Sequence, residues 1–233
     1  MSQLILEEFG LPFSFDIPNA IVKSEILGGF IEQDKDRLPG IVHDGVSLRR
    51  SASIFNDKEN IIWSTADARV IRIRKDETTN NQVIISNLVT NFPNDWNRHE
   101  NLTGKIDFRY AFTSGNGRFD PAKTSMFGYE LNTPLQVRKS WYRPTPASEE
   151  YLTIDNQNVI LMNLKSVENG FIIRLLNADS QHNQTAKIKS KLITNSHAEK
   201  IDLLGTVNQS VEIKEGAFDV TLNAGVFSDI LIK

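Results

Sequence analysis

One eleven-residue stretch of the sequence, from Asn91 to Asn101, concentrates side chains that could bind a ligand. It reads NFPNDWNRHEN and lies between two apolar segments with strand-like alternation. A sugar offers apolar C–H faces to an aromatic ring and hydroxyl groups to amides, carboxylates and guanidinium groups. The stretch supplies both kinds of partner around one tryptophan: Asn94, Asp95, Trp96, Asn97 and Arg98. It indicates a carbohydrate contact, although a long surface loop with its tryptophan packed against the domain would have the same composition.

Residues for other chemistry do not fall into recognisable patterns. The four histidines are not spaced as zinc ligands are: His43, His99, His182 and His197. The sequence has no cysteine and no Gly-x-Ser-x-Gly motif, so it shows no acyl-transfer nucleophile. Five carboxylates are candidates for a glycosidase pair but are more typical of turns and caps: Asp34, Asp36, Asp44, Asp67 and Asp95. We therefore assign no catalytic residue and no metal ligand in this chain.

The overall composition excludes several classes of partner. The net charge is −3 and the isoelectric point is about 5.9, so there is no basic excess to neutralise a nucleic acid. No run of 18 apolar residues occurs, which argues against a membrane span. The N-terminal residues lack the pattern of a signal peptide. Together with the absence of cysteine, this leads us to expect a cytoplasmic protein.

Apolar and polar residues alternate with a period of two along most of the chain, which predicts an all-β protein. In GKIDFRYAF, Phe108 and Phe112 share one face while Asp107 and Arg109 share the other. Turn residues separate such segments at short intervals, as in β-sandwiches. We expect a core that includes the following residues: Phe108, Tyr110, Phe112, Ile160, Leu164, Ile173 and Leu175.

One segment departs from this pattern and predicts a short helix over residues 121–130. Asp120 is suited to the N-cap and Pro121 to the first helical position. Further along, the prolines of RPTPAS indicate a stiff linker. We therefore expect a large β domain over residues 1–148 and a small β-sandwich over residues 149–233.

Several segments, in order, resemble the C-terminal β region of glycoside hydrolase family 38, the retaining α-mannosidases. They are DKDRLPG, WSTADARVIRI, NLVTNFPNDWNRHENLTGKIDFRYAF, and the pair NVILMNLK and GFIIRLLN. The last pair and FRYAF are the most telling. The resemblance covers nearly the whole chain, and it implies a mutarotase-like supersandwich followed by an immunoglobulin-like β-sandwich. It leaves open whether the first domain is complete at its N-terminus.

The resemblance also implies what this chain lacks. In the family, the zinc ion, the nucleophilic aspartate and the acid/base aspartate come from an N-terminal α/β barrel and its neighbours. Nothing in the sequence resembles that barrel, so we expect this chain to hold no cofactor and to be inactive alone. The implied partners are the catalytic barrel and an α-mannoside or oligosaccharide substrate.

The resemblance gives roles to the residues of the tryptophan stretch. The matching loop of the family leans over the active site of the barrel and contacts the sugar. By position, Asn91 and Asn97 would hydrogen-bond hydroxyl groups, and Trp96 would pack on a ring face. Arg98 would hold a hydroxyl group or a carboxylate of the barrel. Here Arg98 follows Asn97 directly, whereas many relatives have an aromatic residue between them.

Three functions from different classes remain open at this point. The first is the non-catalytic C-terminal region of a zinc-dependent α-mannosidase, which contributes substrate contacts and docks the barrel. The second is a stand-alone carbohydrate-binding β module, and the third is a structural interaction domain with no sugar site. An exposed apolar face would favour the first, because a part of a larger enzyme leaves such a face where its partner packs.

Overall fold

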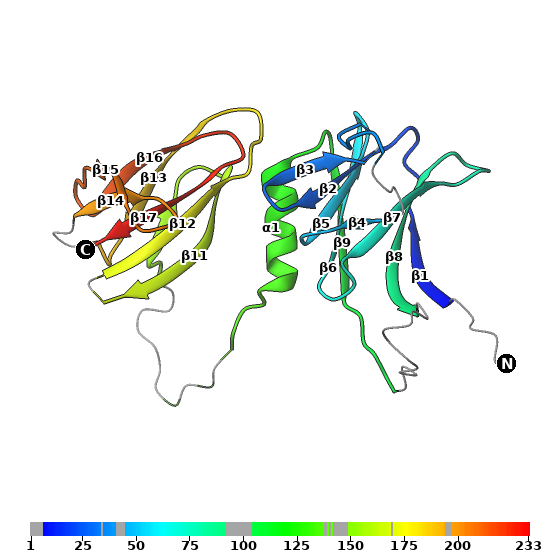
Figure 1. Cartoon of the computed structure of the whole chain (residues 1–233), viewed down its shortest axis with the longest axis horizontal. Coiled ribbons are helices and arrows are strands. Elements are labelled where there is room, and N and C mark those ends of the chain that lie inside the picture. Colours follow the sequence, from blue (N-terminus) through cyan, green and yellow to red (C-terminus); the bar gives the residue numbers. More distant parts are fainter. Residues whose placement is uncertain are drawn as a thin grey trace. The chain divides into compact units, whose positions relative to one another are not determined.

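The computed structural model describes residues 7–33, 35–40, 45–91, 104–137, 139, 141, 149–168, 170–193 and 197–233. The chain forms two compact units, Met1–Pro134 and Leu135–Lys233. Within the described residues all regular elements but one are β-strands, which confirms the predicted all-β class (Figure 1). The boundary expected between residues 148 and 149 stays a prediction, since residues 142–148 lie outside that part. No helix among these residues is long and apolar enough to cross a bilayer.

The first unit is a sandwich of two antiparallel sheets. One sheet has the order β1-β8-β7-β4, made of Glu7–Ser14, Gln82–Asn91, Val70–Lys75 and Val46–Ser47. The other has the order β3-β2-β5-β6-β9, made of Gly29–Glu32, Ile21–Ile26, Ser51–Phe55, Glu59–Thr65 and Tyr110–Asn116. The strands β1 and β9 are therefore outer strands of their sheets.

Apolar side chains from both sheets meet in the core of this unit. Ile71 and Ile84 come from the first sheet, and Ile54 and Trp63 from the second; all four are fully buried. The ring of Phe13 on β1 meets Trp63 edge-on, with 5.3 Å between the ring centroids. This contact links an outer strand of one sheet to the interior of the other, and aromatic pairs of this kind add to the free energy gained from apolar burial.

The helix α1, Pro121–Asn132, covers the face of β5 and β6 that points away from this core (Figure 1). Asp120 caps it by accepting a hydrogen bond from the backbone N of Lys123 at 2.9 Å, as the sequence predicts. Gly128 allows a close approach, because a Cβ there would lie 2.8 Å from Cβ of Arg50. Since the helix covers one face and the core the other, β5 is buried on both faces.

A buried carboxylate links this helix to the sheet. Glu25, on β2, accepts hydrogen bonds from Nη2 of Arg50 at 2.6 Å and from Oγ of Ser51 at 3.0 Å. Oγ of Ser125, on α1, lies 3.5 Å from the same carboxylate. The guanidinium of Arg50 lies 3.5 Å from the ring centroid of Tyr129 on the helix. The helix is therefore held mainly by small and polar side chains.

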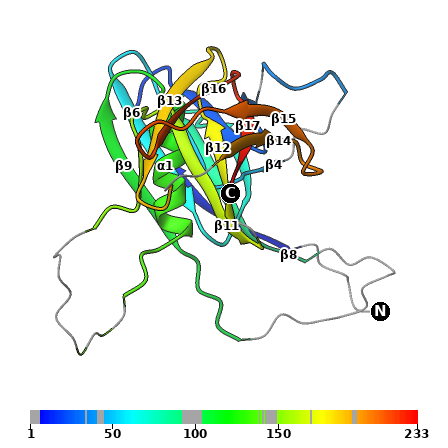
Figure 2. The same cartoon turned by 90° about the vertical axis from the view of Figure 1, so that its left-hand side faces the viewer.

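The second unit is also a sandwich of two antiparallel sheets. One has the order β10-β13-β16, made of Leu152–Ile154, Gln184–Ser190 and Ala217–Leu222. The other has the order β11-β12-β17-β14-β15, made of Val159–Val167, Gly170–Asn177, Phe227–Ile232, Ala198–Ile201 and Val207–Val211. Figure 2 shows β11 and β12 running side by side, as their antiparallel pairing requires.

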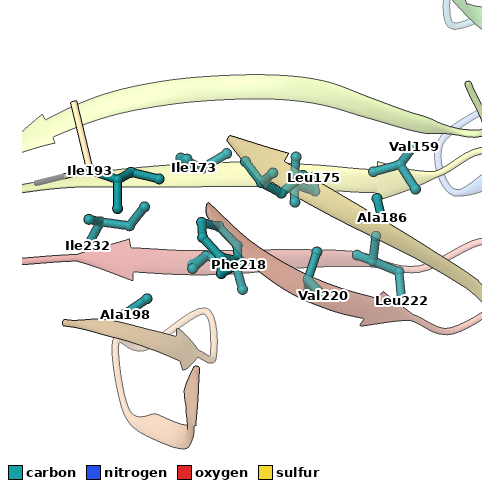
Figure 3. Close-up of a cluster of buried hydrophobic side chains, with 12 residues drawn as sticks. Val159, Ile173, Leu175, Ala186, Ile193, Ala198, Phe218, Val220, Leu222 and Ile232 are labelled. Carbon is teal, nitrogen blue, oxygen red and sulfur yellow. The ribbon is translucent and has the colours of Figure 1, made fainter. Parts of the chain in front are cut away.

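The core of the second unit lies between its two sheets (Figure 3). Ile173 and Leu175 come from β12, and Phe218 and Leu222 from β16; all four are buried. The predicted core residues Ile160, Ile173 and Leu175 are confirmed. Each is at most 2% exposed, so the alternation of β12 identifies buried positions correctly.

The predictions for the other core residues are wrong or only partly correct. Phe112 is 63% exposed, because β9 is the last strand of its sheet and has a neighbouring strand on one side only. Leu164 is 46% exposed on the outer strand β11. Phe108 and Tyr110 are half-buried, and the strand expected from residue 105 begins only at Tyr110.

Candidate functional site

The predicted sugar-contacting stretch leaves the first unit at the end of β8. That strand ends at Asn91, whose backbone pairs with Glu7 at the start of β1 (Figure 1). Five of the predicted site residues lie outside the described residues: Asn94, Asp95, Trp96, Asn97 and Arg98. Their contact with a sugar stays a prediction, as does the role of the Asn91 side chain.

Two strand ends and a helix end meet at the start of β9, the strand that follows this stretch in the sequence. β6 ends at Thr65, which pairs with Tyr110 at the start of β9. The last turn of α1 reaches the same place, because Nδ2 of Asn132 lies 3.4 Å from the carbonyl oxygen of Thr65. Nη2 of Arg69 donates to Oδ1 of Asn132 at 3.0 Å. The end of β6, the start of β9 and the end of α1 thus form a polar rim.

The ion pair between Asp67 and Arg109 contributes three hydrogen bonds to this rim. Nε and Nη2 of Arg109 donate to Oδ2 and Oδ1 of Asp67 at 3.1 and 2.9 Å, and the backbone N of Arg109 donates to Oδ2 at 2.8 Å. These hydrogen bonds hold the pKa of Asp67 below its ordinary value of 3.8 and raise the pKa of Arg109. The pair fixes the backbone just before β9, which is where the chain returns from the predicted sugar-contacting stretch.

An apolar surface lies at the same end of the unit. Phe9, Leu11 and Phe13 alternate along β1, and only Phe13 is covered by aromatic neighbours, Trp63 and Tyr110. Phe9 is 58% exposed and Leu11 is 39% exposed. These three apolar side chains of β1 are therefore covered at Phe13 and exposed towards the start of the strand, where β8 ends. We call Phe9 and Leu11 the open β1 row.

The other polar candidates from the sequence have local structural roles where they are described. Asp36 accepts a hydrogen bond from the backbone N of Glu32 at 2.7 Å. Nδ1 of His182 lies 3.1 Å from Asp179, and Nε2 of His197 lies 3.6 Å from Glu199. The remaining candidates lie outside the described part: Asp34, His43, Asp44, Asp95 and His99. Among the residues that are described, no three His, Asp or Glu side chains group in a way that could hold a metal ion.

Arg109 and Asn132 are residues of the rim that sequence reasoning did not identify. Asp67 was considered only as an isolated carboxylate, and its partner Arg109 lies 42 residues further along the chain. The polar face of the segment around Arg109 was a usable signal, because a charged residue there needs a partner or solvent. No sequence pattern connects Asn132 at the helix end to Arg69, since the contact depends on how α1 packs.

Comparison with known proteins agrees with this architecture. Residues 158–224 match the family model described as the glycosyl hydrolases family 38 C-terminal beta sandwich domain. Among solved structures, an alpha-mannosidase from Enterococcus faecalis V583 matches with a TM-score of 0.71 and 10% sequence identity. The match covers 97% of this chain and 26% of that chain, so this chain spans about a quarter of the length of the matched protein. A search of curated proteins finds no match.

These findings define the class of the protein as an all-β double sandwich. The resemblance inferred from the sequence is confirmed, through the family model over the second unit and through the fold over nearly the whole chain. At 10% identity, the structural match shows the fold alone.

Proposed function

We propose that this chain is the non-catalytic C-terminal β region of a zinc-dependent retaining α-mannosidase. The match of residues 158–224 to the family 38 C-terminal sandwich is the single observation that carries the proposal. The structural match supports it, because the whole chain corresponds in fold to about a quarter of a longer alpha-mannosidase. In this function the chain docks a catalytic barrel and contributes sugar contacts, and its role belongs to mannose metabolism in the cytoplasm.

The open β1 row supports the docking part of the proposal. Phe9 and Leu11 expose apolar surface on an outer strand, whose start pairs with the end of β8 at Asn91. Burying apolar surface yields roughly 25 cal/mol per Å², so a covering domain would gain free energy there. Charged groups next to the row, such as Glu8 of β1 with its partner Arg72, would set the orientation of that domain.

The chemistry would belong to the barrel and not to this chain. The residues of this chain would bind and orient the sugar: Trp96 through a ring face, Asn91 and Asn97 through hydroxyl groups, and Arg98 through a hydroxyl group or a barrel carboxylate. A zinc ion would supply Lewis-acid polarisation and sugar coordination in the complete enzyme. The donor groups of the described residues do not fit a zinc site, so no step is assigned to zinc in this chain.

The proposal is tested by purifying the native assembly that contains this chain through a C-terminal tag. We expect it to hydrolyse an aryl α-mannoside, whereas the isolated 233-residue chain does not. Arg98→Ala in that assembly should lower kcat/KM about tenfold or more, because a charged hydrogen bond is worth about 1.5–3 kcal/mol. Arg118→Ala is the matched control, since Arg118 is exposed and pairs only with the exposed Asp57. Turnover by the isolated chain equal to that of the assembly would overturn the proposal.

A further inference from the structure

The second unit carries a cavity that the proposed function does not use. It has a volume of about 810 Å³ and lies where the start of β10, the end of β13 and the turn at Glu215 and Gly216 meet. Ligand-binding cavities in proteins commonly have about 300–1,000 Å³. The cavity lies wholly within Leu135–Lys233 and involves neither the open β1 row nor the predicted sugar-contacting stretch.

An aromatic ring is held in this cavity with much of its surface open. Tyr151 is 57% exposed, and its Oη donates to Oε2 of Glu149 at 2.9 Å. Nζ of Lys191 donates to Oε1 of the same carboxylate at 2.9 Å. The backbone oxygen of Tyr151 accepts a hydrogen bond from Oγ of Ser190 at 2.6 Å. The residue is therefore fixed at the tip of its ring and at its backbone, which lowers the entropy cost of using the ring as a contact surface.

Polar groups of both signs surround this ring. Lys189 and Thr153 come from the paired strands β13 and β10, which are in register at this point. Glu215 also lines the cavity, in a tight turn where both Glu215 and Gly216 have positive φ. The lining holds two lysines, Lys189 and Lys191, against three glutamates, Glu149, Glu150 and Glu215. This near balance of charge does not favour a strong anion or cation.

Neutral hydroxyl groups suit such a lining better than charged groups do. Each hydroxyl group can donate to a carboxylate and accept from an ammonium or hydroxyl group. A hexose ring also has an apolar face, which an exposed and oriented tyrosine ring can cover while its hydroxyl end stays hydrogen-bonded. The cavity thus offers a ring face and polar groups of both kinds within one open volume.

We propose that this cavity binds a neutral hexose unit of a glycan, with Tyr151 as the ring platform and with Glu215, Lys189 and Thr153 as hydroxyl partners. The site is separate from the sugar contacts assigned to Trp96 and Arg98. It would hold a second part of the same glycan or anchor the protein on a glycan-bearing surface.

The test is an NMR titration of the 233-residue chain with four methyl glycosides: α-mannoside, α-glucoside, β-galactoside and β-N-acetylglucosaminide. At least one should bind with a dissociation constant on the order of 1–10 mM, the range of a small ligand with few contacts. Backbone signals of Tyr151, Lys189 and Glu215 should shift. Tyr151→Ala should weaken binding at least tenfold, and Tyr151→Phe should weaken it less because the ring remains.

Two control variants keep this test separate from the proposed function. Trp96→Ala alters the predicted sugar-contacting stretch and should leave the titration of the Tyr151 cavity unchanged. Phe227→Ala removes another aromatic ring of the second unit, away from the cavity lining, and should also have no effect. Failure of all four glycosides to bind would overturn the inference, as would binding that survives Tyr151→Ala. Either result would leave the activity of the native assembly, and hence the proposed function, untouched.

Discussion

Asp67 accepts three hydrogen bonds from Arg109, two from its guanidinium group and one from its backbone N. The pair joins the turn after β6 to the residue before β9, across 42 positions of sequence. It therefore fixes the point at which the chain enters β9.

Replacing Asp67 with Asn should give a pH-dependent loss of stability. The folded pKa of Asp67 lies below its ordinary value of 3.8, so its stabilising contribution is fully present above that value. The contribution is lost as pH falls through the folded pKa. The difference in unfolding free energy between wild type and Asp67→Asn should therefore be constant from about pH 5 to pH 7 and shrink below about pH 4. Urea titrations at several pH values measure it.

The control for this experiment is Asp107→Asn. Asp107 is also acidic and close in sequence, but both it and its partner Lys105 are exposed, and exposed ion pairs contribute little. The role assigned to the Asp67–Arg109 pair would be contradicted if Asp67→Asn caused no loss of unfolding free energy at pH 7. It would also be contradicted if the loss at pH 3 equalled the loss at pH 7.

Two of the leucines in the β11–β12 hairpin, Leu164 and Leu175, should differ sharply when truncated. Leu175 is fully buried in the second core, so Leu175→Ala should cost about 2–5 kcal/mol of unfolding free energy. Leu164 is 46% exposed, so Leu164→Ala should cost less than about 1 kcal/mol. Chemical denaturation of both variants measures the two values. Equal costs would show that β11 is covered more fully than the structure indicates.

The buried carboxylate beneath α1 should show strong coupling to its partner. Glu25→Gln leaves the Arg50 guanidinium buried without its counter-charge, which should cost about 3–5 kcal/mol. Adding Arg50→Met should cost less than the sum of the two single changes, because the second change removes the unpaired charge. Unfolding free energies of the two single variants and the double variant complete the cycle.

The exposed pair Lys214 and Glu212 is the matched comparison for this cycle. Nζ of Lys214 lies 3.1 Å from Oε1 of Glu212, but the two side chains are 76% and 74% exposed. Its coupling should be below about 1 kcal/mol. Additive effects of Glu25→Gln and Arg50→Met would mean that the short contact between their side chains contributes no more than this surface pair.

Sequence alternation predicted the class of fold but not which strands are outer strands. The start of α1 at Asp120 and Pro121 could be predicted because capping depends only on residues close in sequence. The helix ends at Asn132, two residues beyond the predicted end. Phe112 was misplaced because alternation describes the two faces of a strand and says nothing of its neighbours. On an outer strand such as β9, even the face turned to the core is covered on one side only.

A β-bulge on β11 changes which residues of the strand share a face, but the exposure of Leu164 comes from its position on an outer strand. On β11, Ile160 pairs with Leu176 and Leu164 pairs with Ile173, so the pairing shifts by one residue around Met162. Ile160 and Leu164 therefore point to opposite faces, with Leu164 on the face of the core residue Ile173, although their spacing of four predicted the same face. The polar rim could not be predicted from the sequence for a different reason. Its contacts Asp67–Arg109 and Arg69–Asn132 join distant segments and depend on how the strands and the helix pack.

The most direct measurement of the central claim is the α-mannosidase activity of the native assembly, purified through a tag on this chain. We expect the assembly to hydrolyse an aryl α-mannoside, the isolated chain to have no activity, and Arg98→Ala to lower kcat/KM of the assembly about tenfold or more with Arg118→Ala unchanged. An assembly without α-mannosidase activity, or an isolated chain as active as the assembly, would contradict the claim that this chain is the non-catalytic β region of such an enzyme.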